Sequence, residues 1–134
     1  MDINAVVNKV VNLVKSFHKE DKSFFTLVME SGYIEIHEQI SEDIILNMVE
    51  AQPACIDEWV GFSQDQRITE GWYLANKDGK NVVVRFFDKS EQTPVVKEYP
   101  TMAAACAAFI KHQIEFSREL ALSDLLRKKN KGRK

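Results

Sequence analysis

The sequence has little cysteine, glycine and proline, and each scarcity argues against a class of protein. Its two cysteines, Cys55 and Cys106, form no CxxC pair and have no cysteine or histidine at zinc spacing, so a zinc site is not expected. Buried free thiols are the prediction, with a disulfide or a redox role as the alternative. Five glycines leave little material for a phosphate-binding loop, and no GxGxxG, Walker, GxSxG or HExxH pattern occurs.

Long apolar runs are also missing. No stretch approaches the roughly 20 apolar residues that a membrane-spanning helix needs, and the N-terminus lacks the basic and apolar regions of a signal peptide. We therefore expect a cytoplasmic protein with no membrane partner. A chain of 134 residues with 45% hydrophobic and 28% charged side chains predicts a single domain with one core.

Groups suited to catalysis are few and scattered. His18, His37 and His112 fall on three different predicted elements. His112 and Glu115 share one helical face and could hold a metal or exchange a proton, but a pair at this spacing is more often a surface contact. Adjacent carboxylates such as Glu42 and Asp43 diverge on a helix, which suits shared acid-base chemistry poorly. We expect no enzyme, no metal and no cofactor.

The strongest local signal is a hairpin over residues 71–88. Two runs of β-branched and aromatic residues flank a polar segment that contains Asp78-Gly79, where glycine accepts the positive φ of a tight turn. A third run at 94–99 completes a predicted three-stranded antiparallel meander. The second strand is apolar on both faces, which is typical of an inner strand covered by helices.

Helices are predicted before and after this sheet. Apolar residues at helical spacing follow Asp2, Ser41 and Thr101, each of which can cap a helix N-terminus. The predicted fold is α+β, with the antiparallel sheet packed against N-terminal and C-terminal helices. Residues 23–38 are ambiguous, because they fit either a strand, a turn and a strand that extend the sheet, or a helical segment that ends at Gly32.

Charge is distributed unevenly along the chain. The last eight residues hold six of the 18 basic side chains and no acid, so residues 1–126 carry 12 basic against 20 acidic groups. We expect a single domain at 1–126, followed by a basic tail at 127–134 that has no apolar group to bury and is disordered. Direct nucleic-acid binding is not expected, except weakly through this tail.

Basic residues are absent from residues 23–66, an interval that holds nine carboxylates. Either lysines and arginines from elsewhere in the fold pair with them, or they form a negative surface that faces a positive partner. The second interpretation predicts a docking surface for a basic protein, where complementary charge speeds association and excludes wrong partners. The nine are Glu30, Glu35, Glu38, Glu42, Asp43, Glu50, Asp57, Glu58 and Asp65.

Three motifs point to a family. They are DEWV at 57–60, an SQDQR segment at 63–67 followed by GWY before the DG hairpin, and ACAAFI at 105–110. With these motifs, residues 55–115 resemble bacterial immunity proteins of contact-dependent growth inhibition and polymorphic toxin systems. The resemblance implies a non-enzymatic α+β protein that binds and blocks the C-terminal toxin domain of an effector. It assigns no interface residues, because each immunity protein uses its own surface.

Charge and resemblance together predict a function. Many toxin domains are nucleases with basic clefts, which an acidic surface can occupy in place of nucleic acid. We expect an immunity protein that binds its cognate toxin domain; a secretion chaperone or another acidic adaptor is the alternative. A monomer is favoured, with the oligomeric state left open. Trp59 is a candidate anchor, although a core position suits it better. The predicted contact residues are Tyr33, Glu35, Glu38, Glu42, Asp43, Glu50, Asp57 and Glu58.

Overall fold

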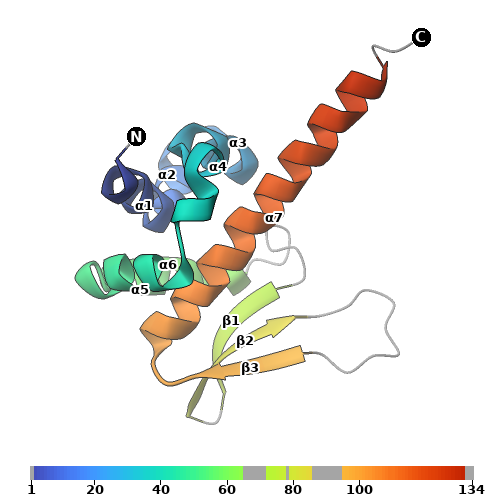
Figure 1. The fold of residues 1–134 in the computed structure, drawn as a ribbon. Coiled ribbons are helices and arrows are strands. Elements are labelled where there is room, and N and C mark those ends of the chain that lie inside the picture. Colours follow the sequence, from blue (N-terminus) through green and yellow to red (C-terminus); the bar gives the residue numbers. More distant parts are fainter. Residues whose placement is uncertain (1, 65–71, 78, 86–94, 132–134) are drawn as a thin grey trace.

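The computed structural model describes residues 2–64, 72–77, 79–85 and 95–131. These residues form helices and a three-stranded sheet (Figure 1), which confirms the predicted α+β fold. In chain order the elements are α1 (Ile3–Val11), α2 (Leu13–Lys19), α3 (Phe24–Ser31), α4 (Tyr33–Ile36), the 3-10 helix η1 (His37–Gln39), α5 (Glu42–Ala51), α6 (Ala54–Gln64), β1 (Trp72–Lys77), β2 (Lys80–Arg85), β3 (Val95–Tyr99) and α7 (Met102–Lys131).

The predicted meander is confirmed. The strand order is β1-β2-β3, and both neighbouring pairs are antiparallel. Gly79 has a φ of 78°, and Lys77 pairs with Lys80 across the turn. Glycine at this position therefore supplies the left-handed backbone conformation that the hairpin signal required.

The middle strand is buried on both faces, as its sequence predicted. Val83 lies opposite Leu74 of β1, and both belong to the main core with the helices. Val82 and Val84, which point to the other face of β2, are also buried. Helix α7 packs on all three strands and on α5, so it joins the sheet to the helical half of the molecule (Figure 1).

The N-terminal helices begin at their predicted caps, and the first predicted helix is interrupted once. Asp2 Oδ1 accepts from the backbone N–H of Asn4 at 3.0 Å, and Ser41 Oγ accepts from the N–H of Ile44 at 3.3 Å. The helix after Asp2 breaks at Asn12, whose side-chain Nδ2 donates to the Asn8 carbonyl at 2.8 Å. This side-chain bond competes with the backbone ladder and divides α1 from α2.

Residues 23–38 do not extend the sheet. They form α3, α4 and the start of η1, so the interpretation as two strands was wrong. The helical alternative, which ends at Gly32, was right for α3, whereas α4 and η1 were not predicted. Two local features explain the outcome. Ser23 Oγ accepts from the N–H of Thr26 at 3.1 Å and starts α3. Gly32 has a φ of 89° and ends it in the left-handed conformation that favours glycine.

Helix α7 starts as predicted and ends later than predicted. Thr101 Oγ1 accepts from the N–H of Ala104 at 3.1 Å, and the buried Ala105, Ala107 and Ala108 let the helix lie close to its neighbours. The helix continues through Lys131, so residues 127–131 are helical where the sequence predicted disorder. Extending a formed helix needs no new nucleation, and basic side chains favour the negative end of its dipole.

The core centres on Trp59. Its side chain is fully buried, it contacts the rings of Phe24, Phe62 and Phe109, and its Nε1 donates to the Val11 carbonyl at 3.0 Å. The aromatic cluster therefore ties α1, α3, α6 and α7 together. The core position of Trp59, favoured from the sequence, is confirmed, and this side chain is not an exposed anchor.

Candidate functional site: an acidic helical surface

The predicted contact carboxylates lie on four consecutive elements, from α4 to α6. Glu35 is on α4, Glu38 on η1, Glu42 and Asp43 in the first turn of α5, Glu50 near the end of α5, and Asp57 and Glu58 in α6. All except Glu58 are exposed.

The structure gathers these acids into two groups. Glu38, Glu42 and Asp43 lie where η1 leads into α5, while Glu50 and Asp57 flank the turn between α5 and α6. With a rise of about 1.5 Å per residue, Asp43 and Glu50 are roughly 10 Å apart along the axis of α5. This distance is close to the screening length of about 8 Å in physiological salt, so screening between the two groups is incomplete and both contribute to one negative potential.

Ion pairs within the chain leave this surface largely unneutralised. In the described part of the interval 23–66, Glu30 makes an ion pair, with Lys22 Nζ at 2.9 Å. The exposed carboxylates from Glu35 to Asp57 make none with any residue that the structure describes. The alternative, in which remote lysines and arginines fold over to pair with these acids, is therefore not what the described residues show.

Lys111 is the basic residue of α7 that reaches the interval. Its Nζ donates to the Ile40 carbonyl at 2.7 Å and to the Tyr33 hydroxyl at 2.8 Å, so its bonds go to neutral groups. Burial lowers the pKa of Lys111, while the charges of Glu115 and Glu42 act in the opposite direction. Lys111 thus moderates the potential near Glu42 without forming an ion pair with it.

Tyr33 is not available as an aromatic anchor, which corrects the sequence prediction. Its side chain is fully buried, and its hydroxyl donates to Glu115 Oε2 at 2.9 Å. Burial and the hydrogen bond to Glu115 raise the pKa of Tyr33 above its ordinary value. In α4 the ring of Tyr33 turns inward, where a partner cannot reach it.

Glu115 completes a buried polar junction between α4 and α7. It accepts from Tyr33 and from Arg118 Nε, the latter at 2.8 Å. Burial alone would raise the pKa of Glu115, but the bonds from Arg118 and Tyr33 and the charge of Lys111 lower it below its usual range. These groups satisfy one another, so the junction holds the two elements together.

Glu58 also differs from the sequence prediction, which treated it as a contact residue. It is half-buried, and its Oε2 is buried without a hydrogen-bond partner among the described residues. One turn earlier in α6 lies Cys55, which is hydrogen-bonded to Cys106 of α7. Both are buried free thiols, and that much was predicted. The hydrogen bond from Cys106 lowers the pKa of Cys55, and the charge of Glu58 opposes that shift. One carboxylate oxygen of Glu58 therefore faces the interior, so Glu58 is a poorer surface contact than the exposed acids beside it.

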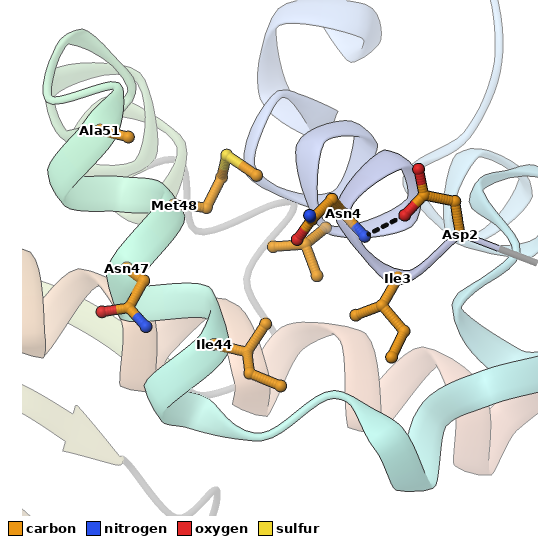
Figure 2. Close-up of a pocket in the computed structure, with 8 residues that line it drawn as sticks. Asp2, Ile3, Asn4, Ile44, Asn47, Met48 and Ala51 are labelled. Carbon is orange, nitrogen blue, oxygen red and sulfur yellow. Dashed lines mark hydrogen bonds between the residues drawn. The ribbon is translucent and has the colours of Figure 1, made fainter.

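A groove between α1 and α5 is a feature that the sequence did not reveal. It encloses about 860 Å³, and Ile3, Ile44 and Met48 point into it from both helices (Figure 2). Pockets of roughly 300–1,000 Å³ accommodate small ligands or protein side chains. The remaining lining residues are Asp2, Asn4, Val7, Asn47 and Ala51. Helical spacing alone could not identify it, because the gap depends on how two helices pack.

Within the described residues, no cluster of three or more His, Cys, Asp or Glu side chains is arranged to hold a metal ion. The His112–Glu115 pair considered from the sequence does not form a site of this kind, because Glu115 is committed to Tyr33 and Arg118. None of the helices in the described ranges is long and apolar enough to cross a membrane. Asp65 and the SQDQR segment from that residue onward lie outside the described residues.

Comparison with known proteins adds no assignment, since no family model, no curated protein and no solved structure matches the chain.

Proposed function

We propose that this protein is a non-enzymatic immunity protein that acts in the cytoplasm and neutralises a basic toxin domain through the acidic surface of α4, η1, α5 and α6. The observation that carries the proposal is the row of exposed carboxylates without ion-pair partners in the described part of the chain. Solvent-exposed charges of one sign repel one another, and a positive partner relieves that repulsion.

The contact surface of the proposal is narrower than the one predicted from the sequence. Tyr33 drops out because its side chain is fully buried, and Glu58 because one of its carboxylate oxygens is buried. The remaining contact residues are Glu35, Glu38, Glu42, Asp43, Glu50 and Asp57. A nuclease domain is the favoured class of toxin, because its cleft must be basic to hold phosphate groups, and carboxylates on a rigid helical surface can take their place.

The test is protection of cells by co-expression. Cells that express the toxin domain encoded beside this gene should survive when this chain is present, and the purified pair should form a one-to-one complex. The double variant Glu38→Lys/Glu42→Lys should bind at least about tenfold more weakly, a loss of about 1.4 kcal/mol. Its affinity should also depend less on salt, because fewer complementary charges remain.

A matched control is Glu119→Lys, which reverses an exposed acid on α7, outside the proposed surface. This variant should protect cells as the wild-type chain does. Failure of the wild-type chain to protect, or equal loss of affinity in Glu119→Lys and in the double variant, would overturn the proposal.

A further inference from the structure

The groove between α1 and α5 is apolar inside and negative along its border. Asp43, Asn47 and Glu50 recur at spacings of four and three residues, so they form one exposed row along α5. Asn47 also lines the groove, which places this row directly beside it (Figure 2). Asp2 lies at the opposite side, on the N-terminal end of α1.

This combination selects for a particular kind of occupant. Ile3, Ile44 and Met48 are only partly buried, so they can gain further burial when an apolar side chain enters. The acidic border then favours basic groups beside that side chain. An amphipathic helix with exposed leucines and a basic end fits both requirements, in the way that helices commonly dock into grooves.

The C-terminal end of α7 has these properties. Leu122 and Leu125 are 49% and 67% exposed, and they lie three residues apart on one side of the helix. Arg127 follows within the next turn; its side chain is 69% exposed and makes an ion pair with Asp124 at 2.9 Å. The sequence from 127 to 134 holds six basic residues, Arg127 among them, and no acid. In the sequence, exposed leucines are thus followed directly by an excess of positive charge.

One copy cannot bring these two surfaces together. Helix α7 is continuous from Met102 to Lys131, and its first half is held against α5 and the sheet. Its C-terminal end extends away from α1 and α5 (Figure 1). A groove can therefore receive this end only from another molecule.

We propose that the groove between α1 and α5 binds the C-terminal end of α7 from a second copy of this chain. Leu122 and Leu125 enter between the two helices, which brings Arg127 toward Asp43 and Glu50. The contact joins two different surfaces, so each pair retains one unoccupied groove and one unoccupied helix end. Association is therefore head to tail and can continue beyond a dimer.

Sedimentation equilibrium of the purified chain tests the proposal without any toxin, and so independently of the proposed function. The mean mass should rise with protein concentration and fall with added sodium chloride, because charge complementarity contributes to the contact. A monomeric mass at every concentration in low salt would overturn the proposal.

Two double variants locate the contact. Leu122→Ser/Leu125→Ser alters the helix end, and Asp43→Lys/Glu50→Lys alters the groove border; each should weaken self-association at least about tenfold. Val96→Ser removes another exposed apolar side chain, 53% exposed on β3. Asp21→Lys reverses an exposed acid that neither lines the groove nor belongs to its border. Both controls should associate as the wild-type chain does, and loss of association in either would count against the assignment.

A mixture of the two double variants tests the head-to-tail arrangement directly. Each variant retains the surface that the other has lost, so an equimolar mixture should form a one-to-one pair that cannot grow further. This outcome also shows that both variants are folded. A mixture that remains monomeric would overturn the head-to-tail arrangement, even if each variant alone is monomeric.

Discussion

Carboxylates inside and outside the basic-free interval differ in whether they have partners. Outside it, Glu115 pairs with Arg118 at 2.8 Å and Asp124 with Arg127 at 2.9 Å, both three residues apart on α7. Inside it, the described ion pair is that of Glu30 with Lys22, which lies just before the interval begins. Proximity in sequence therefore accounts for most of the pairing.

Tertiary packing therefore does little to neutralise the carboxylates of the basic-free interval. Long side chains pair readily with neighbours one helical turn away, where holding two rotamers costs little. A remote lysine must be positioned by the fold, and Lys111 is used to bond a carbonyl and a hydroxyl instead. Partnered acids should thus matter to folding, whereas unpartnered ones should matter to binding.

The largest expected effect is at a partnered acid. Glu115→Ala removes the acceptor of Tyr33 and Arg118, leaves the Tyr33 hydroxyl hydrogen without its acceptor, and should cost roughly 2–3 kcal/mol of unfolding free energy. Urea denaturation measures this loss. Glu119→Ala, at an exposed neighbour on the same helix, should change stability by less than about 0.5 kcal/mol. Equal effects would remove the distinction between the two classes of carboxylate.

The stability that Glu115 contributes to the folded chain should also depend on pH. The folded pKa of Glu115 is lowered from 4.5, so its ionised form is favoured in the folded state and its contribution to stability is complete above pH 4.5. That contribution is lost as the pH falls below 4.5 and through the folded pKa. Urea denaturation at a series of pH values should show this decline in the wild-type chain. In Glu115→Gln this part of the decline should be absent.

Replacing Glu58 should raise the stability of the chain, where replacing Glu115 lowers it. The reason is that a buried oxygen of Glu58 has no hydrogen-bond partner among the described residues. Replacing it with the apolar, similarly long Met should raise stability by up to about 1 kcal/mol, since an unsatisfied buried polar atom is removed. Thermal unfolding measures the gain. Asp57→Asn, at the adjacent exposed acid, serves as the control and should leave the melting temperature almost unchanged. A clear loss in Glu58→Met would indicate that this carboxylate has a partner.

The smallest effect is expected at the unpartnered Glu50. It lies in the last turn of α5, where the helix dipole disfavours negative charge. Glu50→Gln should therefore stabilise the chain by about 0.3–0.5 kcal/mol at low ionic strength, and salt should reduce the gain. Asp43→Asn, in the first turn of the same helix, should destabilise by a similar amount. The reverse order in urea denaturation at low salt would contradict an electrostatic origin.

Much of the fold could be predicted because its signals are local. Asp2, Ser41 and Thr101 cap helices through bonds to backbone groups two or three residues away. Gly79 determines its turn by its own backbone freedom. The paired alternatives for residues 23–38 could not be resolved in this way, because an apolar run next to glycine fits a strand or a helix equally well.

The candidate site was only partly predictable, because part of it depends on contacts between segments that are far apart in the sequence. The sequence identified which carboxylates have no basic neighbour, and six of them are exposed. It could not show that Tyr33 and Glu58 turn inward, or that Lys111 reaches across from α7. Those features depend on the packing of α4 and α6 against the long terminal helix.

The amino-acid sequence by itself determined the helix starts, the hairpin and the one-sided charge of residues 23–66, since each depends on residues close together in the chain. Only the tertiary structure decided which of those charges face solvent, how α7 divides its length between the core and the exterior, and where α1 and α5 leave a groove. Those three features are set by contacts between segments far apart in the sequence, which local patterns do not specify.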